Sequence, residues 1–282
     1  MACYQRALEI VEGSGAHVEA AHLYQELGLA AFRSGENRKA IEWAERALQS
    51  AEAAHSDESS VTPDVRRAAA VAVAHATSTI GVAMARSHQL DAAREHMERS
   101  LEIARSLGLL DVACRAYANL GVLYSTVQPQ RAIEMSLTGL ELASKIGAAS
   151  LQPYIYANLA AAYCALTDRC EAEGLDAAQT AASLDRELEQ LDHLAVPLIV
   201  MAQIHQCQGE HQKAREVYHE ALALAEKIGE PQLILPCYDG LATIHLDRGD
   251  RIRAAEYMER GRDLCQRTGL DPDTLLLLPF LC

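Results

Sequence analysis

The residues that could bind a metal or act as bases cluster near the middle of the C-terminal half. His205, Cys207 and His211 lie close together in the chain, and these residue types are zinc ligands. Cys207 and His211 flank an expected turn, however, and no fourth ligand follows them. A nearby HExxH-like string has alanine in place of its second histidine, which a metalloprotease needs as a ligand. We therefore expect no metal site.

Other catalytic patterns are also missing from the sequence. It contains no GxxxxGK[ST] phosphate loop, no GxGxxG after a strand, no GxSxG and no EF-hand loop. Cys164 and Cys170 flank the string "CALTDRC", where a redox switch is conceivable, but two unreactive thiols are the favoured interpretation. The sequence thus predicts a protein that is not an enzyme and uses no cofactor.

Composition narrows the class of protein. Half of the 282 residues are apolar and 23% are charged, so a large buried core is expected. The net charge of −14, without a block of Lys or Arg, argues against nucleic acid as a partner. The longest uninterrupted apolar runs are too short to span a membrane, and eight cysteines without a CxxC pair suit a reducing cytoplasm.

The elements of this chain are indicated by a repeated string. "YANLGVLY" and "YANLAAAY" occur 39 residues apart. In the first copy Tyr117, Leu120, Gly121 and Tyr124 have the spacing i, i+3, i+4, i+7, so they share one stripe of a helix. A small residue in such a stripe lets a second helix approach closely.

This pattern resembles the tetratricopeptide superfamily, in which an aromatic-x2-Leu-Gly-x2-Tyr helix is followed by a second helix with alanine and a larger residue four positions later. The small residue of the first helix recurs six times, at Gly28, Gly81, Gly121, Ala160, Ala202 and Ala242. Most steps are near 40 residues rather than 34, which predicts longer helices. The resemblance implies an all-α, right-handed superhelical solenoid.

We therefore expect one solenoid over residues 1–282, made of about six helix pairs with a leading half-repeat and a C-terminal cap. The half-repeat is 1–16, the pairs are about 17–55, 63–108, 109–147, 148–190, 191–229 and 230–268, and the cap is 269–282. A half-repeat has no partner for its apolar face, so the chain is expected to be a fragment with another domain before residue 1.

Two asparagines in the repeated string are the main candidates for ligand binding. Asn119 lies roughly 150° around the helix from the apolar stripe, and Asn158 takes the same place one repeat later. First helices line the inner surface of a solenoid, so both side chains should face its groove. An amide offers a donor and an acceptor to a peptide backbone. The alternative is that the asparagines bond each other or water between repeats.

Three charged residues complete the candidate groove. Glu26 occupies the asparagine register of the first pair, and Arg115 and Arg86 could contact a carboxylate or phosphate. A solvated surface is the alternative for either arginine. In the peptide-binding arrays that the chain resembles, the asparagine before Leu-Gly contacts the ligand backbone, and this role is implied for Asn119 and Asn158.

Further strings, among them "LDHLAVPLIV" and the ending "LPFLC", resemble the C-terminal repeat region of bacterial multidomain nucleotide cyclase and ATPase signalling proteins. This resemblance implies a cytoplasmic, non-catalytic scaffold that binds a protein or peptide segment in its concave groove and regulates an attached signalling domain. The alternative is a structural spacer or dimerisation module of such a protein.

Overall fold

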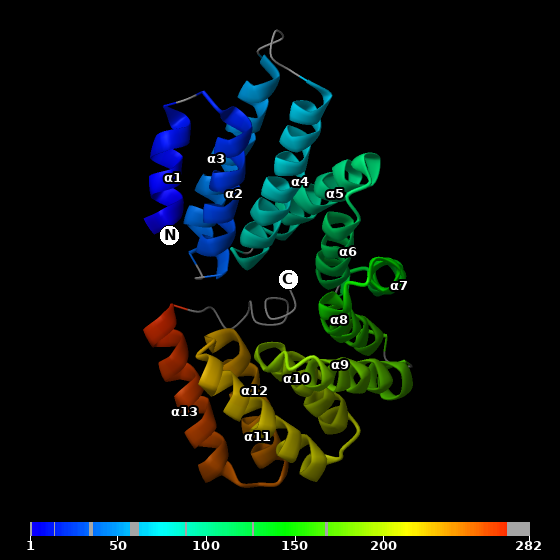
Figure 1. Ribbon diagram of the computed structural model, residues 1–282. Helices are drawn as coiled ribbons and strands as arrows, with labels where there is room; N and C mark the ends of the chain where they lie inside the picture. Colours follow the sequence, from blue (N-terminus) through cyan, green and yellow to red (C-terminus); the bar gives the residue numbers. More distant parts are fainter. Residues whose placement is uncertain are drawn as a thin grey trace. The chain divides into compact units, whose positions relative to one another are not determined.

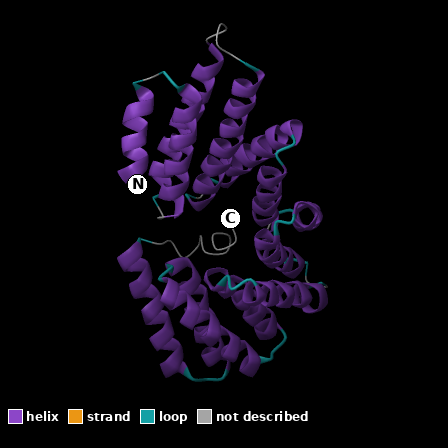
Figure 2. Ribbon diagram, viewed as in Figure 1, coloured by secondary structure: helices purple, strands orange, loops and turns teal. Residues whose placement is uncertain are grey.

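The computed structural model describes residues 2–13, 15–33, 36–56, 62–87, 89–125, 127–166 and 169–269. All regular structure in these ranges is helical (Figures 1 and 2). The helices are α1 (Ala2–Glu12), α2 (His17–Arg33), α3 (Asn37–Ser56), α4 (Pro63–Arg86), α5 (Leu90–Leu107), α6 (Leu110–Ser125), α7 (Pro129–Ile146), α8 (Gln152–Cys164), α9 (Leu175–Glu187), α10 (Leu191–Cys207), α11 (His211–Ile228), α12 (Pro231–Asp247) and α13 (Arg251–Thr268). The fold is that of an all-α helical solenoid.

Each helix pair expected from the sequence contains two of these helices, from α2 with α3 to α12 with α13. The expected half-repeat contains α1, which packs on α2. Two short elements were not expected, a 3-10 turn at Ala149–Leu151 and a π-helical turn, η2, at Cys170–Gly174. The expected cap, 269–282, lies outside the described residues apart from Gly269.

The chain divides into two compact units, residues 1–120 and 121–282, where the sequence predicted one domain. A repeat array has no core common to all of its repeats, because each repeat contacts only its neighbours. Within each unit the first helices of neighbouring pairs also contact one another: α2 contacts α4 in the first unit, and α10 contacts both α8 and α12 in the second.

The two helices of a pair meet at the small residue of the repeat. A Cβ atom added to Gly81 would lie 2.8 Å from Met97 Cγ and 3.1 Å from the backbone oxygen of Ala93, both on α5. One added to Gly121 would lie 2.7 Å from Ser136 Oγ on α7. Carbon atoms in contact are normally about 3.5–4.0 Å apart, so glycine is needed for this approach. The packing role predicted for the small residue is confirmed.

Several helix ends carry capping residues. Thr62 Oγ1 accepts a hydrogen bond from the Val65 N–H at 3.3 Å, and Pro63 occupies the first turn of α4. Glycines with left-handed backbone follow four of the second helices, at Gly108, Gly147, Gly229 and Gly269. Such a residue satisfies the last carbonyl groups of a helix, and glycine adopts this conformation without a Cβ clash.

Among the described helices, α4 is long and apolar enough to qualify as a membrane span by composition alone. Its apolar window is 61% buried inside the protein, which is the pattern of a core helix packed among its neighbours. The buried alanines of α4 lie in a helix that packs against α3 and α5.

The fourth pair departs from the other repeats at the end of α9. Glu189 has a φ of 55° at the position where other second helices are followed by glycine. Four residues earlier Asp185 is 1% exposed, where Ala104, Ala143 and Ala225 occur in other repeats. Burial raises the pKa of the Asp185 carboxyl to about 7.

We predict that Gly81→Leu destabilises the protein by about 3 kcal/mol or more, because the added side chain must displace α5 from α4. Thermal or urea unfolding followed by circular dichroism measures this change. The control is Glu102→Leu on the exposed face of α5, which should change stability by less than about 0.5 kcal/mol. Equal effects of the two leucines would contradict a close seam at Gly81.

We predict that Asp185→Asn stabilises the protein increasingly as pH rises from 4 to 8. The folded-state pKa is raised above the unfolded value near 3.8, so the wild-type protein loses stability between about pH 4 and pH 7 as the buried carboxyl ionises. One pKa unit corresponds to about 1.4 kcal/mol, so Asp185→Asn raises the free energy of unfolding by at most about 4 kcal/mol at pH 8. The difference in melting temperature should be absent at pH 4 and largest at pH 8, whereas the exposed control Asp192→Asn should show no such trend.

Candidate binding site

A row of polar side chains occupies one register of the first four repeats. Counting six residues back from each small seam residue gives His22 on α2, His75 on α4, Arg115 on α6 and Tyr154 on α8. The last two repeats have valine and proline at this register. Polar side chains therefore recur on successive first helices in the N-terminal and central repeats.

In the first unit these side chains lie close enough for their charges to interact. Burial lowers the pKa of His75, which is half-buried on α4. Asp111 on α6 raises this pKa, Arg115 and His22 lower it, and Glu26 raises it. Three consecutive first helices thus contribute to one charged cluster, which we call the inner charged row and define as His22, Glu26, His75, Asp111 and Arg115.

The structure brings two of the predicted site residues together in this row. Arg115 is exposed and Glu26 is half-buried, and both act on His75. Arg86 does not join them. Its Nη1 donates to the backbone oxygen of Phe32 at 3.4 Å, and its guanidinium carbon lies 4.2 Å from the centre of the Phe32 ring. Arg86 therefore fastens the end of α4 to the end of α2.

The predicted exposure of the two asparagines is wrong in this structure. Asn119 and Asn158 have exposed fractions of 0% and 1%. The side of a first helix opposite the seam was expected to face the groove. In this fold first helices also pack against each other, and this packing can cover that side. The residues from Val112 to Ser125 are buried all around α6, with the exception of Arg115. Backbone binding by the asparagines stays a prediction.

In the second unit, polar groups meet between the first helices α8 and α10. Tyr154 Oη and His193 Nε2 form a hydrogen bond, and the two ring centres lie 4.1 Å apart. Burial lowers the pKa of His193. Its other ring nitrogen, Nδ1, is buried and has no hydrogen-bond partner among the described residues. The neutral imidazole therefore keeps one unused hydrogen-bonding position.

Sequence reasoning missed the part that several residues play in these clusters, namely His22, His75, Asp111, Tyr154 and His193. Three of them share the register of Arg115, which sequence reasoning did select. Extending the repeat alignment from the asparagine register to the position one turn earlier would have found them. Asp111 and His193 carry no such signal.

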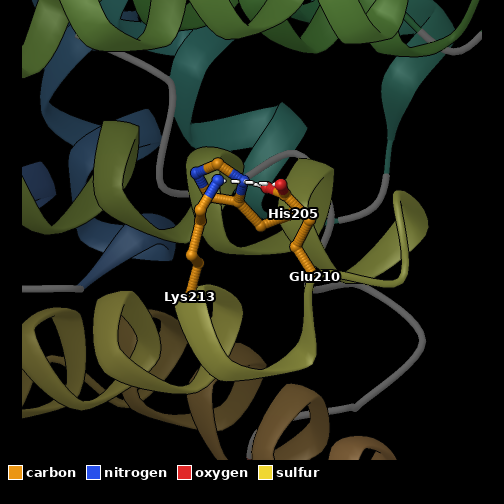
Figure 3. Close-up of polar contacts among 3 residues, drawn as sticks. All are labelled: His205, Glu210 and Lys213. Atoms are coloured by element: carbon orange, nitrogen blue, oxygen red, sulfur yellow. Dashed lines mark hydrogen bonds and ion pairs between the residues drawn. The ribbon is translucent and has the colours of Figure 1, made fainter.

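The turn between α10 and α11 contains a polar cluster of buried His205 with the more exposed Glu210 and Lys213 (Figure 3). His205 Nδ1 lies 2.7 Å from Glu210 Oε2, and Lys213 Nζ donates to Glu210 Oε1 at 2.7 Å. These hydrogen bonds, first from Lys213 and then from His205, lower the pKa of the Glu210 carboxyl. The carboxylate thus joins the end of one helix to the start of the next.

The same arrangement returns in the last pair. His245 Nδ1 lies 3.3 Å from Asp250 Oδ2, and the backbone N–H of Arg253 donates to Asp250 Oδ1 at 3.2 Å. Both histidines are less than 10% exposed, as expected for packing residues at the seam. The repetition at the same register identifies these clusters as turn clamps of the fold.

Earlier repeats close the corresponding turn with an aromatic ring and an arginine. Arg131 lies 4.2 Å above the ring of Tyr124, and Arg169 lies 4.5 Å above the ring of Tyr163. In a cation–π contact the positively charged group is attracted to the face of the aromatic ring, which stabilises the turn. In the last two repeats, the histidine–carboxylate clusters thus occupy the place of this cation–π contact. Their structural role is to hold the turn between the two helices.

A hollow of about 680 Å³ lies beside these clamps, between α11 and α13. Its walls are polar and include Arg215, His219, His245 and Tyr257. Sites for organic cofactors are mostly apolar with a few polar groups, so this hollow does not have their character.

Two buried thiols and the inner charged row differ in the chemistry that they offer. Burial raises the pKa of the thiols of Cys114 and Cys237 to about 11 and about 12, so both are protonated at neutral pH and are poor nucleophiles. Within the described ranges, no three His, Cys, Asp or Glu residues are grouped to hold a metal ion. The inner charged row offers donors, acceptors and both signs of charge to a ligand.

Comparison with known proteins agrees with this description. Residues 193–267 match the family model described as "Tetratricopeptide repeat". Comparison with curated proteins finds no match.

Three solved structures share the fold. The apo form of RapI has a TM-score of 0.70 at 15% identity, over 94% of this chain and 91% of RapI. NprR in complex with its cognate peptide NprX has a TM-score of 0.69 at 14% identity, over 97% of this chain and 76% of NprR. A STAND protein with a tetratricopeptide repeat sensor from Pyrococcus horikoshii has a TM-score of 0.65 at 15% identity, over 98% of this chain and 42% of that protein.

Proposed function

We propose that this chain is a non-catalytic scaffold of tetratricopeptide repeats, which binds a peptide or protein segment along its first helices. The binding surface in the first unit is the inner charged row. In the second unit it is the surface around Tyr154 on α8 and His193 on α10.

One observation carries this proposal. Histidine, histidine and arginine occupy the same register on three successive first helices, and Glu26 and Asp111 act on the same histidine. Side chains at a repeated register are spaced along a solenoid, as the residues of an extended peptide are spaced along its backbone. A preorganised row of donors and acceptors lowers the entropy lost when such a segment binds.

Two comparisons support a peptide as the ligand. NprR and a Rap protein, which share this fold, were solved with a cognate peptide and with competence and sporulation factor. The arginine and carboxylate groups of the inner charged row are suited to a peptide of mixed charge, because the row contains both signs.

The scaffold would act as a regulatory module of a bacterial signalling protein in the cytoplasm, where the ligand changes the activity of an attached domain. A STAND protein with a repeat sensor is one precedent for joining this fold to a signalling module. Asn119 and Asn158 would contribute to the ligand site only if binding exposes their buried amides.

We predict that removing the charges of the inner row weakens peptide binding at least tenfold. The experiment selects binders to the wild-type chain from a displayed library of random 12-residue peptides. It then measures Kd of a selected peptide by fluorescence polarisation. The variant Glu26→Ala with Arg115→Ala removes two contacts, and losing about 1.4 kcal/mol would already raise Kd tenfold.

The matched control replaces one acid and one base on the exposed faces of second helices, Glu42→Ala with Arg105→Ala. Its Kd should stay within twofold of wild type, and circular dichroism should show that both variants are folded. If the library yields no binder, or if the control weakens binding as much as the row variant does, the proposal is wrong.

A further inference from the structure

The structure places two thiols against each other at an irregular turn of the fourth repeat. Cys164 is the last residue of α8 and Cys170 is the first residue of η2. Cys170 Sγ donates to Cys164 Sγ at a sulfur–sulfur distance of 2.7 Å. A disulfide bond is about 2.05 Å long, so the two sulfurs need to approach by less than about 1 Å.

The surrounding turn is built around this pair. A Cβ atom on Gly174 would lie 3.0 Å from Cys164 Sγ, so glycine leaves the space that the sulfur occupies. Arg169 donates through Nε to Glu173 Oε1 at 2.8 Å while its guanidinium lies over Tyr163. These contacts hold the residues next to both cysteines and keep the thiols facing each other.

We propose that Cys164 and Cys170 form a site of reversible oxidation, at which a low-molecular-weight disulfide converts the two thiols into an intramolecular disulfide. The juxtaposed sulfurs carry this inference. Disulfides in reducing compartments are mostly transient and redox-sensing, which agrees with a proposed cytoplasmic protein. The inference does not depend on what the inner charged row binds.

The exchange proceeds in two balanced steps. The thiolate of Cys170 attacks one sulfur of oxidised glutathione and expels one glutathione thiolate, leaving a mixed disulfide on Cys170. Cys164 then loses its proton to solvent, and its sulfur attacks Cys170 Sγ and expels the second glutathione thiolate. Both thiolates take up protons, so two protein thiols and one small disulfide become one protein disulfide and two small thiols.

The environment decides which thiol attacks first. Burial raises the pKa of Cys164, and the hydrogen bond from Cys170 raises it further. Burial also raises the pKa of Cys170, but its hydrogen bond to Cys164 lowers it again. Cys170 therefore ionises before Cys164. Because both pKa values are raised, the exchange is slow at neutral pH and should accelerate as the pH rises.

The test incubates the reduced full chain with oxidised glutathione, alkylates the remaining thiols and locates the disulfide by peptide mass spectrometry. We expect a Cys164–Cys170 cross-link, a fall from eight free thiols to six, and recovery of all eight with dithiothreitol. Closing a loop of seven residues should raise the melting temperature by about 3–6 °C.

The controls are Cys164→Ala and Cys170→Ala, which should abolish both the cross-link and the shift in melting temperature. Cys265→Ala removes a thiol on α13, away from this turn, and should leave both unchanged. Circular dichroism verifies that each variant is folded, and either cysteine variant alone is sufficient for the test. A mixed disulfide that stays on Cys170, or pairing of Cys164 with another cysteine, would overturn the inference.

Discussion

The close approach of two helices at a small residue is the contact on which this protein depends. At Gly81 and Gly121 an added Cβ atom would lie 2.8 Å and 2.7 Å from side chains of the partner helix, so a larger residue would require this seam to shift. A short distance between helices brings the other stripe residues of both helices into contact over several turns. Every repeat has glycine or alanine at this position, whereas the polar positions differ from repeat to repeat.

Polar groups therefore occur in different places in different repeats. Residues at the ends of first helices support the turn, through a tyrosine under an arginine in the central repeats and through a histidine bonded to a carboxylate in the last two. Other polar residues lie on the first helices, before the small seam residue. The charged row of the first unit and the Tyr154–His193 pair of the second unit both arise there.

The fourth repeat shows how a repeat can depart from the pattern and still pack. Asp185 replaces a buried alanine, Glu189 adopts a backbone conformation that other repeats give to glycine, and the second helix opens with a π-helical turn. Each of these features costs free energy in isolation. All three features occur in the fourth repeat, which is therefore less regular than the other five.

The sequence by itself determined the class of fold and the helix pairs, because the seam contact needs a small residue at a fixed helical position and this requirement is local. It also selected Glu26 and Arg115, since a shared register needs only counting. The burial of Asn119 and Asn158 was decided by the tertiary structure, because the covering of a first helix by its neighbours depends on how repeats stack. The same holds for the meeting of Cys164 with Cys170, which required the path of an irregular turn that no helical periodicity predicts.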